Sequence, residues 1–244
     1  MKEKLGGIVL AIGDGGNDVG MIQMANVGVG ILGKEGNSAS AASDFSIGEF
    51  QLLDRLVLHH GRWFYYRLSY FFVYYGWKNL IMTLILFFFM TESAFSAFPG
   101  LSEPFITVYN IIIGLVLVLY YSIFEQDIND DQYRPAFASL PIFYKEVKKQ
   151  DLFSYTRYLA WSIFGLVIAI FIYLVTRYSL GSTAIIGPDG TPGDFALFSE
   201  ALAIEITIIV IVVLITDIKM YTWFSTFLVI GVLTIIGTIG FFLV

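Results

Sequence analysis

The sequence has no cysteine and little charge: charged residues make up 14% of its 244 positions. The absence of cysteine excludes disulfides and thiolate-bound metal ions. Lys and Arg number 14 against 20 Asp and Glu, so no basic excess points to nucleic acid, and we expect no such partner. Apolar residues reach 57%, which is too high for an ordinary soluble domain and predicts an integral membrane protein.

Proline is absent from the forty residues 51–90. Proline interrupts helices, so its absence allows this stretch to form one continuous helix. The stretch begins with mixed charges and ends, at residues 80–90, almost wholly apolar. Such a helix would be about 60 Å long, enough to leave a soluble domain and cross a hydrocarbon core of about 30 Å. We expect the rest of the chain to be organised around it.

Five apolar runs have the length of membrane-spanning helices. They are residues 70–90, 106–124, 158–176, 197–215 and 223–244. Lys and Arg gather between the second and third runs, and Lys219 lies between the fourth and fifth, whereas residues 91–105 contain neither. The positive-inside rule then predicts a multi-pass protein with the N-terminal segment, the loop 125–157 and the Lys219 turn in the cytoplasm.

The N-terminal segment has an α/β pattern. Residues 7–12 form a continuous apolar run, typical of a strand buried on both faces of a parallel sheet. Residues 17–25 have helical spacing, residues 27–31 predict a second short strand, and residues 38–43 allow one or two helical turns. This order predicts a piece of a Rossmann-like layer. The first run is too short for a signal peptide, and no cleavage pattern comes after it.

Two acids lie at the carboxyl end of the first predicted strand, where open α/β sheets bind ligands. In the motif IGDGGND, Asp14 and Asp18 are hard oxygen ligands of the kind that Mg²⁺ takes alongside phosphate oxygens. The alternative is a tight Asp-Gly turn, with Asn17 and Asp18 capping the next helix. The motif by itself favours the turn.

Three glycines downstream spell the G-x-G-x-x-G pattern of dinucleotide-binding loops: Gly28, Gly30 and Gly33. That pattern should follow a strand and open a helix, whereas residues 27–31 are themselves the predicted strand. We therefore expect no dinucleotide there.

Lys78 lies inside the first apolar run, about 12 Å along the helix axis from Tyr70. An ammonium at the bilayer centre costs about 2.5 to 3.5 kcal/mol, so it should face a partner or a polar cavity. The alternative is a membrane that begins near Trp77, which would make Lys78 an interface anchor. Ionisable groups inside spans are functional hypotheses by default, which favours the first interpretation.

Three other polar residues lie within the apolar runs. Glu205 is deep in the fourth run, and three roles stay open for it: a protonated acid, the partner of a cation, or a group that lines water. Asn79 and Asn110, in the first and second runs, are expected to form hydrogen bonds between helices.

The stretch IGDGGNDVGMIQMANVGVGI, together with its downstream sequence, resembles the hinge end of the phosphorylation domain of P-type ATPases. Five later segments resemble the type IV branch, the phospholipid flippases, in the same order: ASDFSI, FQLLDRLVLHHGRWFYYRLSYF, YYGWKN, VYN and FEQDI. PIFYKEVKKQDLFSYTRYLAW and YTWF extend the resemblance over essentially the whole chain. The resemblance implies an α-helical polytopic membrane protein preceded by a fragment of a Rossmann-like, HAD-type phosphorylation domain.

The resemblance also implies roles for single residues. Asp14 would coordinate the catalytic Mg²⁺, Asn17 would bind phosphate or nucleotide, and Asp18 would assist both. Lys78, next to Asn79, would lie in the membrane pathway of the lipid head group. The implied cofactors are Mg²⁺ and ATP, the implied substrate is phospholipid, and an accessory glycoprotein subunit is a partner that such flippases often require.

The implied activity is ATP-driven movement of phospholipid between bilayer leaflets. Residues 1–50 would be the end of the phosphorylation domain, 51–69 a cytoplasmic stalk and 70–244 the transmembrane domain. The sequence has no Asp-Lys-Thr-Gly phosphorylation motif, so we expect no catalytic nucleophile in it. We expect this chain to be the C-terminal part of a longer flippase and to be inactive alone.

The sequence departs from the flippase pattern at a few points. It has a Gly-Gly pair at 15–16 instead of Gly-Ala, Trp77 where tyrosine is usual, and no proline in the helix after VYN, where two are often found. Two alternatives stay open. One is a fragment of a cation-transporting P-type ATPase, which Glu205 favours, and the other is a non-catalytic membrane module.

Overall fold

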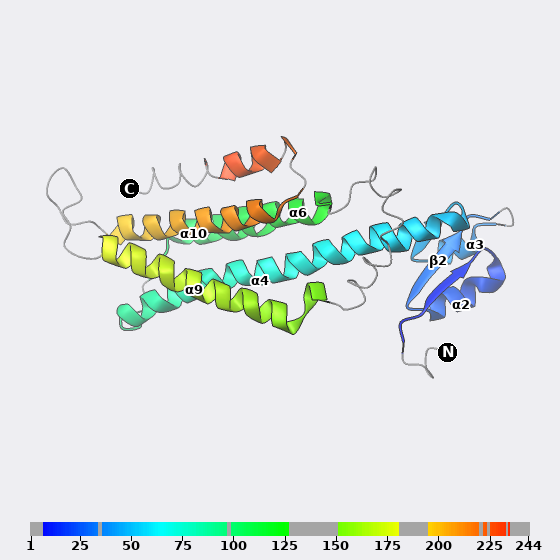
Figure 1. The fold of residues 1–244 in the computed structure, drawn as a ribbon, viewed down its shortest axis with the longest axis horizontal. Coiled ribbons are helices and arrows are strands. Elements are labelled where there is room, and N and C mark those ends of the chain that lie inside the picture. The colour runs from blue at the N-terminus through cyan, green and yellow to red at the C-terminus, as the bar shows by residue number, and fades with distance from the viewer. Residues whose placement is uncertain are drawn as a thin grey trace. The chain divides into compact units, whose positions relative to one another are not determined.

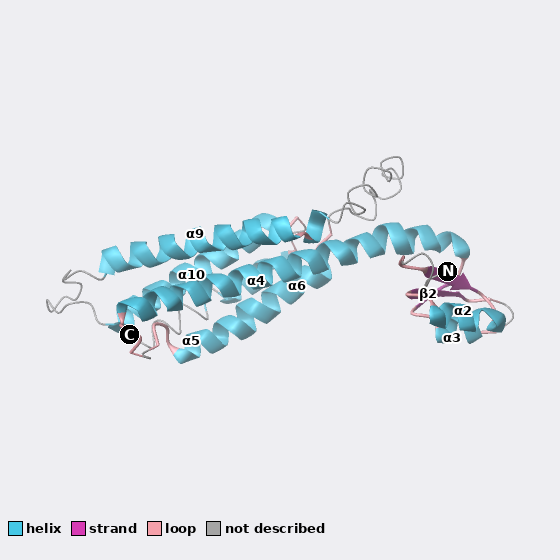
Figure 2. Cartoon of the chain, turned by 90° about the horizontal axis from the view of Figure 1, so that it is seen from below, coloured by secondary structure: helices cyan, strands magenta, loops and turns pink. Residues whose placement is uncertain are grey.

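A computed structural model describes residues 7–33, 36–96, 99–126, 151–180, 195–219, 222–223, 225–232 and 234 of the chain. The chain divides into two compact units, Met1–Arg62 and Trp63–Val244. The first unit holds a small parallel sheet with short helices, and the second holds long apolar helices (Figure 1, Figure 2).

The first unit is built on a 3-stranded parallel sheet with the order β1-β2-β3. Its strands are β1 (Leu10–Gly13), β2 (Val27–Ile31) and β3 (Phe45–Ile47). The connections carry the 3₁₀ turn η1 (Gly16–Asp18), α2 (Val19–Met24) and α3 (Ser38–Ala42). The predicted order of strand, helix and strand is confirmed. The sequence pattern does not predict β3, because three residues carry too little periodic signal.

Two glycines of β2 let both helices approach the same face of the sheet. A Cβ built on Gly28 would lie 2.6 Å from Ile22 Cγ2 in α2. A Cβ built on Gly30 would lie 2.6 Å from the Cα of Ser40 in α3. Residues two apart in a strand point to the same face, so α2 and α3 cover one side of β2. The prediction that residues 27–31 form a strand is confirmed, and these glycines serve close packing of helices on that strand.

One expectation for the first strand is wrong. Residues 7–12 predict a strand buried on both faces, but β1 begins at Leu10, and Ile8 and Leu10 are 87% and 42% exposed. The reason is the strand order, which puts β1 at an edge and makes β2 the buried central strand. The helices α2 and α3 lie on the same face of the sheet.

The long helix predicted from the absence of proline is confirmed. Helical backbone runs without a break over Phe50–Glu92. It starts as the 3₁₀ turn η2 (Phe50–Leu52), widens into the π-helix η3 (Arg55–His60) and continues as α4 (Gly61–Glu92). Because a π-helical turn holds an extra residue, it rotates the side chains that come after it relative to those before it.

In the second unit, three further helices pack with α4. One is continuous over Glu103–Phe124 and consists of α5 (Glu103–Val108), the π-helix η4 (Tyr109–Leu117) and α6 (Val118–Phe124). The others are α9 (Tyr155–Leu180), preceded by the 3₁₀ turn η6 (Asp151–Phe153), and α10 (Phe195–Asp217). Their buried side chains form one apolar core with those of α4.

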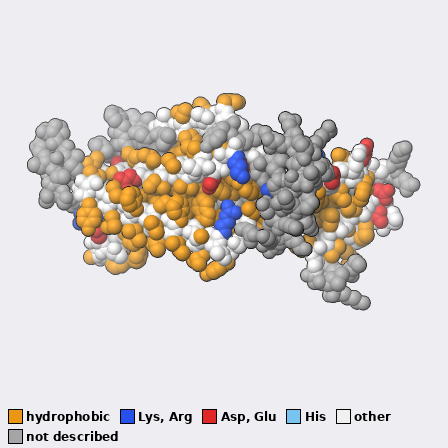
Figure 3. Space-filling model, in the orientation of Figure 1, with side chains coloured by type: hydrophobic (Ala, Val, Ile, Leu, Met, Phe, Trp, Pro, Cys, Tyr) orange, Lys and Arg blue, Asp and Glu red, His pale blue; other side chains and the backbone are white. Residues whose placement is uncertain are grey.

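In the described part of the chain, four helices are long and apolar enough to cross a membrane: Phe50–Glu92, Glu103–Phe124, Tyr155–Leu180 and Leu197–Asp217. They match the first four predicted runs, and apolar side chains cover most of the visible face of these helices (Figure 3). The fifth predicted run, residues 223–244, lies largely outside the described residues. The prediction of a polytopic α-helical membrane protein with a Rossmann-like piece is confirmed.

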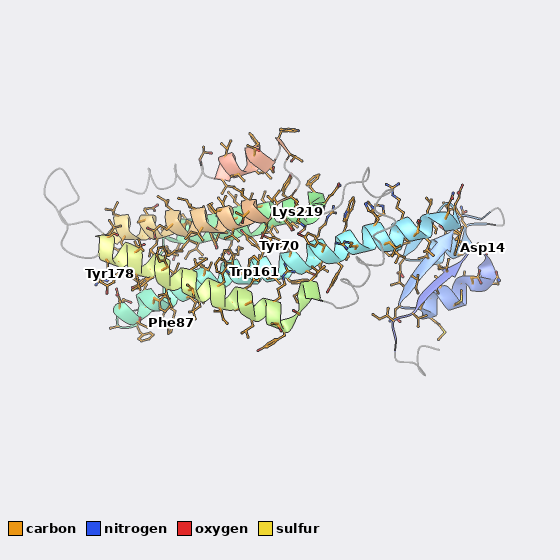
Figure 4. All side chains as sticks on the ribbon, in the orientation of Figure 1. Asp14, Tyr70, Phe87, Trp161, Tyr178 and Lys219 are labelled. Carbon is orange, nitrogen blue, oxygen red and sulfur yellow. The ribbon has the colours of Figure 1, made fainter. Side chains whose placement is uncertain are left out.

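Aromatic side chains fill the space between α4 and α9. Trp77 stacks on Phe164 at a ring-centroid distance of 5.8 Å and meets Trp161 edge-on at 5.6 Å. Tyr70 meets Trp161 edge-on as well, at 6.2 Å (Figure 4). Gly165 provides the room for this cluster, because a Cβ built there would lie 3.0 Å from Trp77 Cδ1.

Gly165→Leu should destabilise the helical unit by about 1 to 3 kcal/mol, the usual cost of overpacking a core. The leucine side chain would have to enter the space that the Trp77 ring occupies. Gly231→Leu is the matched control, because a Cβ on Gly231 meets no atom within 4 Å. Thermal unfolding of both variants in detergent measures the difference, and equal midpoints would contradict this account of the packing.

Candidate functional site

The turn between β1 and α2 carries the two predicted magnesium ligands, Asp14 and Asp18. Asp14 is labelled in Figure 4. Oδ2 of Asp18 accepts hydrogen bonds from the backbone N–H groups of Asp14, at 3.2 Å, and Gly15, at 3.4 Å. A Cβ built on Gly13 would lie 2.3 Å from the Cβ of Asp18, so only glycine lets Asp18 reach back over the strand end. Asp18 therefore closes the turn, which is the structural role that the motif by itself favours.

Asp14 is the more open of the two acids. Its side chain is exposed, and no hydrogen bond or ion pair engages its carboxylate within the described part of the chain. Asn17, in η1, is exposed as well. The turn thus presents one carboxylate that is fixed by backbone N–H groups and one that is available to a ligand.

The oxygen atoms of Asp14, Asn17 and Asp18 would bind Mg²⁺ only together with further ligands. Mg²⁺ binds through one or two carboxylates and keeps several waters or takes substrate phosphate oxygens. Over the described residues, no group of three or more His, Cys, Asp or Glu could hold a metal ion by itself. The residues present therefore fit a magnesium ion that is shared with a phosphate group.

A lysine is fully buried in α4. Lys78 is 0% exposed, and its Nζ donates a hydrogen bond to Oδ1 of Asn79 at 2.8 Å. The ring centroids of Tyr109 and Tyr75 lie 4.6 Å and 4.9 Å from the same Nζ. An interface anchor keeps its ammonium in water, so the structure disagrees with the anchor alternative for Lys78.

The neighbouring helix Glu103–Phe124 is shaped to receive this ammonium. A Cβ built on Gly114 would lie 2.8 Å from Lys78 Nζ. The hydroxyl of Tyr109 donates to the backbone carbonyl of Lys78 at 3.0 Å. Both Gly114 and Tyr109 belong to the π-helix η4. The irregular turn and the glycine together admit the lysine at this helix contact.

The ammonium of Lys78 has more N–H donors than strong acceptors among the described residues. It carries three N–H groups, of which the amide of Asn79 takes one, and the two tyrosine rings offer only weak attraction to the rest. No carboxylate contacts Lys78 within the described residues. A buried charge without a counter-ion favours any anionic group that reaches it.

Glu205 is held by a neighbouring helix. The hydroxyl of Thr176 in α9 donates to Glu205 Oε2 in α10 at 2.7 Å. In the described part of the chain no cation contacts this carboxylate, so the role of cation partner is not what the structure shows.

Two tyrosines that the sequence pattern does not single out, Tyr74 and Tyr109, make further polar contacts between helices. The hydroxyl of Tyr74 in α4 donates to the backbone carbonyl of Val210 in α10 at 2.7 Å. Asn79 instead bonds to Lys78 in its own helix, and Asn110 is exposed, so the expected helix-to-helix role is not found for either. Tyr74 lies four residues before Lys78, so the two side chains share one face of α4. This spacing is the feature of the sequence that could have indicated a role for Tyr74.

Comparison with known proteins agrees with this architecture. The family model described as Phospholipid-translocating P-type ATPase C-terminal matches residues 40–244. The chain is 38% identical over 184 residues, 75% of its length, to Probable phospholipid-transporting ATPase 12 of Arabidopsis thaliana. It is 34% identical over 242 residues, 99% of its length, to Probable phospholipid-transporting ATPase IM of Homo sapiens. It is also 34% identical over 229 residues, 93% of its length, to Phospholipid-transporting ATPase IC of Xenopus tropicalis.

The chain spans only a small part of these relatives. The matched regions are 15%, 20% and 18% of the three proteins, in the order given above. The family match nevertheless covers both the end of the α/β unit and the apolar helices. The chain belongs to the phospholipid-translocating P-type ATPases and corresponds to their C-terminal region.

Proposed function

We propose that the chain serves ATP-driven translocation of phospholipid between bilayer leaflets, as the C-terminal part of a longer flippase. The observation that carries this proposal is the buried ammonium of Lys78, whose contacts are an amide and two tyrosine rings instead of a carboxylate. Phosphate is the anionic group that all phospholipids share, and an ammonium with free N–H groups binds it through charge-assisted hydrogen bonds.

Cation transport is the nearest competing function. A transported cation needs several oxygen ligands. The buried ionisable group of α4 is Lys78, which is itself a cation. Glu205 is the residue whose presence favours cation transport, but its carboxylate accepts a hydrogen bond from Thr176. The described side chains therefore support a lipid phosphate better than a metal ion.

The turn after β1 is proposed to take part in phosphoryl transfer. Asp14 and Asp18 would hold Mg²⁺, and Asn17 would contact phosphate or nucleotide. When bound, Mg²⁺ neutralises charge on the phosphate oxygens of ATP and of the transferred group. Asp18 fixes the backbone of the turn through two N–H groups, which orients the open carboxylate of Asp14. In this proposal the phosphorylated aspartate lies outside the present sequence.

The continuous helix Phe50–Glu92 is proposed to couple the two activities. It begins shortly after β3 and carries Lys78 in its apolar part. A displacement at its N-terminal end during the phosphorylation cycle would move Lys78 against Gly114 and change access to the ammonium. The predicted boundaries at residues 50 and 69, which separate phosphorylation domain, stalk and transmembrane domain, belong to this proposal.

Exposed apolar residues at the start of β1 support the idea of a larger domain. Ile8, two residues before β1, is 87% exposed, and Leu10, the first residue of β1, is 42% exposed. β1 is an edge strand, where a sheet readily accepts a further strand or a covering helix. We propose that the remainder of the phosphorylation domain covers these apolar residues.

The proposed function also includes a location and a partner. The distribution of Lys and Arg supports a cytoplasmic location for the N-terminal unit. An accessory glycoprotein subunit is the proposed partner.

In the full-length protein, Asp14→Asn should abolish the phosphoenzyme formed from ATP, because a neutral amide is a poor substitute for a carboxylate ligand of Mg²⁺. Asp18→Asn keeps an oxygen for the N–H groups of Asp14 and Gly15, so it should retain the fold and still lose phosphoenzyme. Asp18→Ala should lower the melting temperature as well. Acid-quenched labelling with radioactive ATP and thermal unfolding measure these effects, and normal phosphoenzyme in Asp14→Asn would refute the metal assignment.

Lys78→Ala should remove the stimulation of ATP hydrolysis by phospholipid. Gly114→Ala should keep the lysine but raise the phospholipid concentration for half-maximal stimulation by about tenfold, because its methyl group displaces the ammonium and weakens a charged hydrogen bond. Asn110→Ala is the matched control, since Asn110 is an exposed polar residue of the same helix. ATPase assays in mixed micelles measure all three variants.

The outcomes of these assays separate the competing functions. Unchanged lipid stimulation in Lys78→Ala would refute a role for the lysine in the lipid pathway. Turnover that depends on an ion and ignores lipid would favour cation transport. A full-length protein without phosphoenzyme or turnover would favour a non-catalytic membrane module.

A further inference from the structure

Three helices of the second unit come together where α6 and α10 end. Glu125 comes directly after α6. Lys219, which Figure 4 labels, comes two residues after α10. Tyr66 and Arg67, neighbours in α4, contact these two residues. We call Tyr66, Arg67, Glu125 and Lys219 the helix-end junction.

Glu125 is the central residue of the helix-end junction. Its side chain is 3% exposed, and its Oε1 accepts the backbone N–H of Lys219 at 2.9 Å. Its backbone carbonyl accepts the Nε–H of Arg67. Glu125 is therefore bound to α4 through its main chain and to the segment after α10 through its side chain.

The contacts of the junction form a closed ring. Lys219 Nζ lies 5.2 Å from the ring centroid of Tyr66, so the segment after α10 also touches α4. One helical turn further along α4, Tyr70 stacks on Tyr121 of α6 at a centroid distance of 4.0 Å. The ends of α6 and α10 are thus both attached to the same short stretch of α4.

Burial of a carboxylate costs desolvation free energy, which hydrogen bonds to that carboxylate must offset. The backbone N–H of Glu125 donates to the carbonyl of Tyr121 and ends α6. The bonds through its carbonyl and its side chain instead join residues that are 58 and 94 positions away in the sequence, so these two contribute nothing to local helix formation. Through these two long-range bonds Glu125 connects the end of α6 with α4 and with the segment after α10.

We infer that Glu125 is a positioning residue that ties α4 to the ends of α6 and α10, so that a displacement of α4 moves the lipid-binding helices together. This inference rests on the proposed function, because it concerns the coupling of ATP hydrolysis to lipid movement. Without the Glu125 side chain, the carbonyl of Glu125 still accepts from Arg67, but the end of α6 no longer holds the segment after α10. Hydrolysis then continues, while α10 no longer moves together with α4 and α6.

The first test compares Glu125→Ala with Glu125→Gln, which keeps an oxygen for the N–H of Lys219. The full-length protein is placed in phospholipid vesicles, and the number of fluorescent phospholipids moved per ATP hydrolysed is measured. Glu125→Ala should lower this ratio by about tenfold, as expected for an equilibrium that loses a hydrogen bond to a charged group, and Glu125→Gln by no more than about twofold. A purely structural defect would lower both rates and leave the ratio unchanged.

The second test removes the donor instead of the acceptor. Lys219→Pro has no backbone N–H, and Lys219→Ala keeps it, so the pair isolates the hydrogen bond to Glu125. Lys219→Pro should lower the coupling ratio as Glu125→Ala does, and Lys219→Ala should lower it less. Adding Glu125→Ala to Lys219→Pro should cause no further loss, whereas additive losses would show that the two groups act independently and would overturn the inference.

A third measurement reports the junction without any lipid transport. The chain contains no cysteine, so Tyr66→Cys with Lys219→Cys creates a single thiol pair in it. A short bismaleimide should crosslink this pair, and Glu125→Ala should slow the crosslinking several-fold, as read by mass spectrometry of the joined peptides.

The three measurements distinguish a failure of this inference from a failure of the proposed function. If the unaltered protein moves no lipid, the proposed function fails, and the crosslinking rate still decides whether Glu125 positions α4. If the unaltered protein moves lipid and Glu125→Ala keeps its coupling ratio, the inference about Glu125 is overturned and the proposed function stands.

Discussion

The helical unit depends on the burial of one ammonium group between two apolar helices. In hydrocarbon, Lys78 is tolerated only against groups that replace its water. The neighbouring helix provides them in two ways: Gly114 leaves the space for Nζ, and Tyr109 presents a ring face to it. A larger residue at position 114 would force the ammonium away from the helix contact. The glycine and the π-helical turn that holds it are therefore conditions for α4 and η4 to pack as they do.

In the α/β unit, too, a glycine leaves the space that a polar side chain occupies. Gly13 has no Cβ to obstruct Asp18, so that carboxylate can accept the N–H groups of the turn. Because Asp18 is occupied in this way, the open carboxylate is the one at Asp14. The acid pair is thus unequal: one member shapes the turn and the other is available to an ion. This asymmetry supports the turn interpretation of the IGDGGND motif and is compatible with the metal role proposed above, although the sequence presents the two as alternatives.

Features that depend on run length and local periodicity could be predicted from the sequence, whereas features that depend on register could not. The continuous helix through residues 51–90, four spans and the strand at 27–31 result from local patterns, and the structure has them. The contact of Lys78 with Gly114 and Tyr109 depends on how two helices are rotated against each other, and a single sequence does not encode that rotation in any short window. The exposure of β1 depends on strand order, which is equally non-local.

Three hydrogen bonds between α4 and its neighbours, among those of the described residues, run to backbone carbonyls. Arg67 donates to the carbonyl of Glu125, Tyr74 to that of Val210, and Tyr109 donates to α4 itself at Lys78. Each such bond in a membrane is worth about 0.6 to 1.7 kcal/mol, so three amount to a few kcal/mol. That is enough to favour one helix arrangement and small enough for the phosphorylation cycle proposed above to exchange it for another. Because a hydrogen bond is either made or broken at a given carbonyl, the proposed motion of α4 would be a shift between discrete arrangements instead of a continuous slide.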